Sequence, residues 1–359
     1  MFAHRVNAVN YSATVNPLLR ELDFPHGEPP APGTTLELAP GVHWLRMPLP
    51  FALDHINLWL LDDNDGYTII DCGFGSQETK ALWERIFAAR VNGRTVKRVL
   101  VTHYHPDHMG LAHWLTERFG VEMWTAQAEF LTAHAALSSI GPFGTEPLIE
   151  LFRTNGIDGD RLELVRKRGN SYTKGVAALP VAYRRVMDGD EILINGRGWR
   201  AIMGYGHAPE HAAFYCAELD VLISGDMVLP SISTNVGVWA TDPMGNPLQL
   251  FLDSITRYGE LPADTFVLPS HGLPFRGMRK RVAQLHNHHR DRLAEVVAAC
   301  SEPRHACELL PVLFRRQLDM HQIYFAIGES IAHLHLLEAQ GRVKRVVDDV
   351  GVIRFVRVG

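Results

Sequence analysis

The residues best suited to chemistry lie together in one run of six residues. This run holds three histidines, His103, His105 and His108, and the carboxylate of Asp107. Imidazole nitrogens and carboxylate oxygens are ligands of Zn²⁺, and iron and manganese also accept such a set. On an extended chain His103 and His105 point to the same side, whereas Pro106 turns the chain and directs the next donors to a second position. We therefore predict a metal site; the alternative is a solvated, histidine-rich loop.

The elements around this run must hold it in place. An apolar, β-branched stretch at 96–101 directly precedes it and predicts a buried strand, after which loops commonly carry functional residues. Apolar runs at 55–61 and 67–71 flank a turn cluster and predict a hairpin. Helical periodicity is present at 77–89 and 110–119. Further strands are expected at 121–125, 191–194, 199–203, 213–216, 221–224 and 266–268.

The chain divides into segments of different character. Residues 1–40 are expected to be an irregular, Pro-rich lead-in, and 41–279 to be the catalytic domain. Within this domain, 127–180 are expected to be a largely helical insertion over one end of the sheet. From Arg276 to the end, 14 basic and 9 acidic residues give a net charge of +5, and the preceding 21 basic and 31 acidic residues give −10. This asymmetry indicates a separate C-terminal unit at 280–359.

The run at 103–108 resembles the HxHxDH signature of the metallo-β-lactamase superfamily. Matching elements in the expected order extend the resemblance over residues 40–275. One departure is Ala208-Pro209-Glu210, where the family more often has Thr-Pro-Gly. The resemblance implies an α+β fold, the four-layer αββα sandwich. The other matching motifs are Asp71-Cys72-Gly73, Gly206-His207-Ala208-Pro209-Glu210-His211, Ser224-Gly225-Asp226 and Ser270-His271-Gly272.

The resemblance also implies a dinuclear centre of two divalent ions, zinc first, with iron or manganese as alternatives. Each ion would have three protein ligands and share a bridging carboxylate, which leaves positions open for water and substrate and is typical of a catalytic site. A hydroxide shared by two such ions is a strong nucleophile at neutral pH. The implied ligands are His103, His105 and His207 for one ion, Asp107, His108 and His271 for the other, and Asp226 as the bridge.

Two further residues are expected to support these ligands. Asp71 fits the orientation of a ligand histidine through its free N–H, although an aspartate after a strand can also cap a turn. His211, four residues after His207, is expected to orient or pack rather than to bind metal. Asp107 or Asp226 is expected to accept or relay a proton.

The predicted reaction is hydrolysis, in which the shared hydroxide attacks a carbonyl or phosphoryl group. The leading substrates are thioesters and esters, lactones included, of a small molecule or an acyl carrier, as in glyoxalase II-like enzymes. Tyr104 or Tyr205 is expected to donate a hydrogen bond to the oxyanion. Trp239 either lines the substrate pocket or packs in the core. The C-terminal region does not resemble the glutathione-binding domain of true glyoxalase II.

The C-terminal unit is predicted to be helical at 284–299, 304–315 and 321–340, followed by a hairpin of 343–347 and 352–356. Helices that end in a β-wing resemble a winged-helix domain. This addition resembles that of a superfamily subgroup that includes hydrolases, carrier-protein thioesterases and an endoribonuclease. Its apolar pattern favours docking on the catalytic domain, or on the partner in a homodimer, over binding of nucleic acid.

Three alternatives remain open. A phosphodiesterase or endoribonuclease would use the same ions and hold RNA with the basic C-terminal unit, and its binding would depend strongly on salt. A mononuclear iron oxygenase would leave His108 and His271 without a role. A non-catalytic ligand-binding protein is disfavoured because no ligand position is lost.

Composition sets wider bounds. A length of 359 residues suggests about two domains, and 46% hydrophobic with 21% charged residues is typical of a globular protein. The net charge of −5 lacks the basic bias of a dedicated nucleic-acid binder. No apolar stretch is long enough to span a membrane, and the start lacks a secretory pattern, so we predict a cytoplasmic protein. Four scattered cysteines predict buried thiols rather than disulfides.

Overall fold

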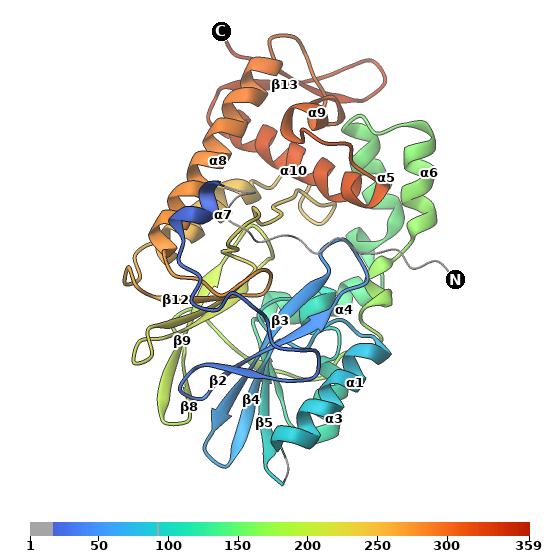
Figure 1. Ribbon diagram of the computed structural model, residues 1–359. Coiled ribbons are helices and arrows are strands. Elements are labelled where there is room, and N and C mark those ends of the chain that lie inside the picture. Colours follow the sequence, from blue (N-terminus) through green and yellow to red (C-terminus); the bar gives the residue numbers. More distant parts are fainter. Residues whose placement is uncertain (1–16, 92) are drawn as a thin grey trace, which may run out of the picture.

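Two β-sheets form the centre of the protein, whose computed structural model describes residues 17–91 and 93–359 (Figure 1). The first sheet has seven strands in sequence order, and the second has five in the order β12-β11-β10-β9-β8. The first consists of β1 (Leu36–Ala39), β2 (Val42–Pro48), β3 (His55–Asp63), β4 (Gly66–Ile70), β5 (Thr95–Leu100), β6 (Met123–Thr125) and β7 (Arg184–Arg185). The second consists of β8 (Glu191–Ile194), β9 (Arg197–Gly204), β10 (His211–Cys216), β11 (Val221–Gly225) and β12 (Phe266–Pro269).

The predicted hairpin is confirmed, since β3 pairs antiparallel with β4. From β4 onward the first sheet is parallel, so β5, which leads to the histidine-rich run, lies in its interior. The expected strands of the second sheet are also present. Apolar runs flanked by turn residues were therefore a sufficient signal for these strands.

One part of the expected lead-in belongs to the sheet. Strand β1 pairs antiparallel with β2, in the register Leu36 opposite Trp44. Leu36 and Leu38 are partly buried and alternate with the exposed Glu37, a short edge-strand pattern that the flanking prolines obscured. The structure also contains α7 (Pro247–Tyr258), a helix for which the sequence analysis had no expectation.

Helices cover the outer face of each sheet, which gives four layers. The outer face of the first sheet packs on α1 (Gln77–Ile86), α3 (Ala112–Phe119) and α4 (Gln127–Leu137) through Trp83, Leu115 and Ala133. Between the sheets lie large buried side chains from both, including Trp59 and Phe214. The outer face of the second sheet packs on α7. This order of layers is the expected αββα sandwich.

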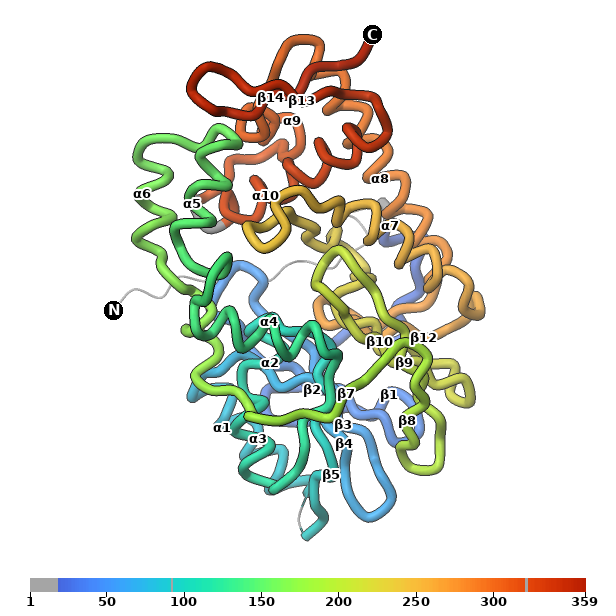
Figure 2. Tube along the Cα trace, turned by 180° about the vertical axis from the view of Figure 1, so that it is seen from behind, coloured from blue at the N-terminus to red at the C-terminus, as the bar shows by residue number. Residues whose placement is uncertain are grey.

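The helical insertion is split between two cores. Helix α4 packs on the first sheet, as expected. Helices α5 (Thr145–Thr154) and α6 (Gly159–Arg168) instead share a core with the C-terminal helices through residues such as Phe152 and Val165. Seen from behind, both helices lie beside α10 (Met320–Ala339) (Figure 2). The insertion therefore joins the catalytic domain to the C-terminal region as well as covering the sheet.

The C-terminal region contains α8 (Met278–Ala299), α9 (Leu310–Leu313), α10 and the hairpin β13 (Val343–Val347) and β14 (Ile353–Arg357). The helix expected at 304–315 is shorter than predicted. A 3₁₀ turn at Ala306–Leu309 precedes α9, and Pro311 lies in the first turn of α9, where it lacks the N–H that a continuous helix would need. Gly341 follows Gln340, the C-cap of α10, and has a positive φ of 68°, a conformation that glycine commonly adopts just after a helix.

All four cysteines are free, and Cys72, Cys216 and Cys300 are buried, as predicted. Among the helices that the structure describes, none combines the length and hydrophobicity needed to cross a membrane.

Candidate metal centre

The donors of the predicted metal site follow the carboxyl ends of strands from both sheets. His103 comes after β5, and the short helix α2 (Pro106–Met109) that begins behind it carries Asp107 and His108. The loop after β9 carries His207, and Asp226 and His271 follow β11 and β12. The two sheets therefore direct these loops to one place at the edge of the sandwich.

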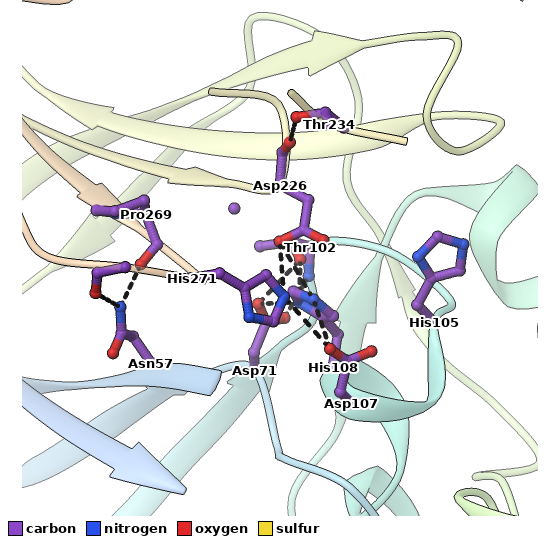
Figure 3. A network of polar contacts seen from close by, with 12 residues as sticks. Asn57, Asp71, Thr102, His105, Asp107, His108, Asp226, Thr234, Pro269 and His271 are labelled. Atoms are coloured by element: carbon purple, nitrogen blue, oxygen red, sulfur yellow. Dashed lines mark hydrogen bonds and ion pairs between the residues drawn. The ribbon is translucent and has the colours of Figure 1, made fainter. Parts of the chain in front are cut away.

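The structure brings all seven predicted donors together in two groups, and the donor atoms within each group lie within 4.8 Å of one another. The close-up in Figure 3 shows Asp107, His108, Asp226 and His271 converging from separate segments. The first group is His103, His105, His207 and Asp226, and the second is Asp107, His108 and His271.

Asp226 lies between the two groups. Its Oδ2 is 3.5 Å from His207 Nε2, and its Oδ1 is 3.5 Å from Nε2 of both His108 and His271. On the other side of the second group, Asp107 Oδ2 is 3.4 Å from His271 Nε2. The Asp226 carboxylate therefore lies 3.5 Å from histidines of both groups.

In three histidines, the ring nitrogen that faces away from the cluster is hydrogen-bonded to a carbonyl or carboxylate oxygen, which can only accept. His207 Nδ1 and His271 Nδ1 donate to backbone carbonyls at 2.8 Å, and His108 Nδ1 donates to Asp71 Oδ2 at 2.8 Å. Because Nδ1 then carries a hydrogen, Nε2 is the nitrogen that faces the cluster, and in the neutral imidazole it bears the lone pair. Metal-binding histidines are typically oriented in this way.

Among the donor residues of the two groups, two buried atoms have no hydrogen-bond partner, His108 Nε2 and Asp226 Oδ1. An unsatisfied buried polar atom costs about 1–3 kcal/mol. In the first group, His103 Nε2 lies 2.9 Å from His105 Nδ1 and 3.2 Å from His207 Nε2, so three ring nitrogens converge on one place. A divalent cation in each group would satisfy these atoms, and the nitrogen and oxygen donors fit such an ion.

The charges of the second group also favour cations. Burial opposes protonation of His108 and His271, but the neighbouring carboxylates outweigh it. They raise the pKa of His108 well above its usual range and that of His271 to about 10. In turn, His271 and His108 hold the pKa of Asp226 well below its usual range, despite its burial. Positive charge is thus stabilised where the second ion would bind.

Two histidines of the first group, His103 and His105, are neutral at ordinary pH. Burial and the neighbouring imidazoles hold the pKa of His103 well below its usual range and lower the pKa of His105 to about 3. A neutral imidazole is the form that binds metal, so no proton has to be removed from these two ligands at neutral pH.

Asp71 supports the second group, as predicted from its motif. The carboxylate is fully buried, and its Oδ1 accepts a hydrogen bond from the backbone N–H of Thr102 at 2.8 Å. Its Oδ2 accepts from the Thr102 hydroxyl at 2.9 Å and from His108 Nδ1 at 2.8 Å. The sequence analysis did not assign Thr102 a role, and the only signal was its position directly before His103.

His211 lies outside both donor groups and holds the backbone of Asp226. Its Nε2 accepts a hydrogen bond from the backbone N–H of Asp226 at 3.1 Å. The intervening Gly225 has φ of 54°, and a Cβ there would lie 2.2 Å from His211 Nε2. Glycine is therefore required in the Ser224-Gly225-Asp226 motif.

Two polar residues on β3 hold the loop of His271. Asn57 Nδ2 donates to the carbonyls of Pro269 and Gly272 at 2.8 and 2.9 Å (Figure 3), and His55 Nε2 accepts from the Gly272 N–H at 3.0 Å. The sequence analysis assigned neither residue a role. The available signal was the presence of two polar residues at the start of a strand whose centre is apolar.

Glu129 on α4 was missed by the sequence analysis and connects two ligand loops. Its carboxylate accepts the backbone N–H of Tyr104 at 2.8 Å and the backbone N–H of Glu210 at 2.6 Å. Tyr104 lies in the histidine-rich run and Glu210 lies in the His207 motif. Burial raises the pKa of Glu129 to about 7, although both hydrogen bonds oppose this shift.

We expect Glu129→Gln to lower the free energy of unfolding by about 1–3 kcal/mol, because an amide has one accepting oxygen and leaves a buried N–H unpaired. Urea denaturation at pH 8, where the Glu129 carboxyl is mostly ionised, measures this change. Glu150→Gln, at an exposed position of α5, is the matched control, with an expected change within about 0.5 kcal/mol. Equal stability of the Glu129 variant and the unchanged protein would contradict this role.

The tyrosines proposed to bind the oxyanion have different surroundings. The ring of Tyr104 lies 4.7 Å from that of His105. Burial and the nearby carboxylates of Glu210 and Asp188 instead raise the pKa of Tyr205, and Arg257 opposes this shift. Asp188 and Arg257 form an exposed ion pair. An oxyanion role for Tyr205 therefore rests on its sequence position alone.

Trp239 contacts the C-terminal helix α10. Its ring lies 5.4 Å from that of Tyr324 and 6.0 Å from that of Phe325. Trp239 is only partly buried, so it combines packing against α10 with an accessible surface.

Comparison with known proteins agrees with this geometry. The chain is 47% identical to a beta-lactamase domain protein from Burkholderia ambifaria, over 96% of this chain and 100% of that one, with a TM-score of 0.90. It is 25% identical to a probable metallo-hydrolase of Bacillus subtilis over 82% of this chain and 92% of the relative. It is 26% identical to a hydroxyacylglutathione hydrolase of Haemophilus influenzae over 59% and 82%.

Two family models match the chain. Residues 293–358 match the metallo-beta-lactamase-like C-terminal domain. Residues 52–271, well over half of the 359 residues, match the metallo-beta-lactamase superfamily. The protein therefore belongs to the metallo-β-lactamase superfamily of metal-dependent hydrolases.

Proposed function

We propose that the protein is a dinuclear hydrolase of thioester or ester bonds, lactones included. The observation that carries the proposal is the position of Asp226, within 3.5 Å of histidines in both donor groups. Two divalent ions bound there would supply a water nucleophile at neutral pH and stabilise the charge of the oxyanion. The donors suit zinc first, and also iron or manganese.

The chain's own residues have separate tasks in this proposal. Three histidines of the first group and the three residues of the second would bind the ions, and Asp226 of the first group lies 3.5 Å from histidines of both. The side chain of Asp107 is 14% exposed, compared with 9% for Asp226, so Asp107 is the better placed to pass a proton to the leaving group. Burial raises the pKa of Tyr104, which keeps its hydroxyl protonated and able to donate to an oxyanion.

Two observations support an acyl substrate. One relative is named a hydroxyacylglutathione hydrolase, an enzyme that releases an acyl group. The partly exposed aromatic cluster of Trp239, Tyr324 and Phe325 offers an apolar wall for such a group.

RNA is a weaker candidate substrate because arginines of the C-terminal hairpin are already paired. Arg345 lies 2.8 Å from Glu338, and Arg354 lies 3.0 Å from Asp348. These ion pairs reduce the positive charge available to phosphates.

A substrate panel tests the proposal. The protein, loaded with Zn²⁺, is offered aryl esters, acyl thioesters, lactones, a phosphodiester reporter and RNA. We expect hydrolysis of at least one carboxylic ester or thioester, and two ions per chain by elemental analysis. Cleavage confined to the phosphodiester or RNA, or binding of a single ion, would overturn the proposal.

A further inference from the structure

The segment between Asp226 and α7 touches both a metal-binding loop and the C-terminal helix. The backbone carbonyl of Asn235 accepts the hydrogen bond from His207 Nδ1 at 2.8 Å. One residue earlier, the Thr234 hydroxyl donates to the carbonyl of Asp226, as Figure 3 shows. The segment therefore contacts two proposed ligands, the side chain of His207 and the backbone of Asp226.

The same segment lies directly on α10. The backbone N–H of Val238 donates to the carbonyl of Gly328 at 3.0 Å. A Cβ at Gly328 would lie 3.1 Å from the Val238 carbonyl oxygen and 3.4 Å from Gly237 Cα, so the two backbones approach closely at this point. Val236 and Val238 are 1% exposed and belong to the core that contains α10.

One polar side chain of α10 completes the contact. The Asn235 side-chain amide donates to Glu329 Oε2 at 3.3 Å. Burial raises the pKa of Glu329 to about 7, and its hydrogen bond with Asn235 partly opposes this shift. A carboxyl group keeps an accepting oxygen whether it is ionised or neutral, so this contact does not depend on the protonation state.

We propose that Glu329 is a positioning residue of the metal centre, which acts through Asn235 on the orientation of His207. Glu329 fixes the Asn235 side chain, and the rigidly held residue then presents its carbonyl to His207 Nδ1. The C-terminal region thereby becomes a structural part of the site. This inference rests on the proposed metal centre, and it adds a residue outside the segment that matches the catalytic family model.

Metal affinity tests the proposal without relying on catalysis. Zn²⁺ affinity is measured by chelator competition, and the visible spectrum of the Co²⁺-loaded protein reports ligand geometry. We expect Glu329→Ala and Asn235→Ala each to weaken binding at one of the two sites by about 10-fold or more and to change the Co²⁺ spectrum. Glu329→Gln keeps an acceptor for the Asn235 amide and should stay within about twofold of the unchanged protein.

Two comparisons separate positioning from general destabilisation. The double variant Asn235→Ala with Glu329→Ala should bind no more weakly than either single variant, because both remove the same contact. Glu338→Ala, on α10 but paired with Arg345 at the hairpin, should leave affinity and spectrum unchanged. If Glu329→Ala does not fold, Asn235→Ala still tests the contact.

The proposal is overturned if Asn235→Ala, or a folded Glu329→Ala, binds both ions as tightly as the unchanged protein with the same Co²⁺ spectrum. It is also overturned if Glu338→Ala weakens binding as much as Glu329→Ala. Failure of the proposed function would look different, because the unchanged protein would then bind fewer than two ions or hydrolyse no ester.

Discussion

Asp226→Asn should abolish hydrolysis and reduce the metal content below two ions per chain. The carboxylate lies 3.5 Å from three proposed histidine ligands in two groups, and an amide removes the negative charge and turns a donor N–H toward the cations. Loss of several kcal/mol of transition-state stabilisation corresponds to a rate decrease of about 10³-fold or more. Ester hydrolysis rates and elemental analysis measure the two effects.

The matched control is Asp220→Asn, in the turn between β10 and β11. Asp220 has a positive φ of 49°, which asparagine tolerates, and its carboxylate accepts from Thr265 away from the metal centre. This control should keep its metal content and activity. An Asp226→Asn protein that retains two ions and a rate within tenfold of normal would refute the bridging role.

Asp71→Asn should weaken metal binding by about 10–100-fold while the backbone conformation is kept. Asp71 has φ of 63°, a conformation that asparagine adopts readily. The amide oxygen can still accept from the backbone N–H of Thr102, but the amide nitrogen replaces the oxygen that accepts from His108 Nδ1. Two donors would then face each other, which favours the other tautomer of His108 and removes its Nε2 lone pair from the cluster.

Chelator competition and circular dichroism measure the effect of Asp71→Asn. Thr102→Ser serves as the comparison, because it keeps the hydroxyl that donates to Asp71 and should bind metal normally. Unchanged affinity in the Asp71 variant would show that His108 does not depend on this carboxylate. An equal loss in Thr102→Ser would assign the effect to packing at this position.

Local sequence signals were sufficient where the residues that act together are also close together along the chain. The spacing of His103, His105, Asp107 and His108 after an apolar strand required only short-range geometry, and the structure places all four in the two donor groups. The same holds for the β3–β4 hairpin, because its turn residues separate two apolar runs.

Supporting contacts were harder to predict because their partners are distant in sequence. Glu129 is 81 residues from Glu210, and Asn235 is 94 residues from Glu329. Each is one polar residue on a helix or loop without a local pattern, so nothing nearby distinguishes it from a surface residue. The split of the insertion between two cores was missed for the same reason, since the apolar faces of α5 and α6 do not reveal which core they join.

Residue types and spacings along one continuous chain were enough to predict the donor residues, the strands that precede them and the family. Only the folded structure shows that Asp226 lies 3.5 Å from histidines of both donor groups, that Asp71 accepts a hydrogen bond from His108, and that α10 contacts the segment behind His207. Each of these arrangements requires two sheets and the C-terminal helices to pack at defined positions. Such packing is a property of the whole core, and no local pattern encodes it.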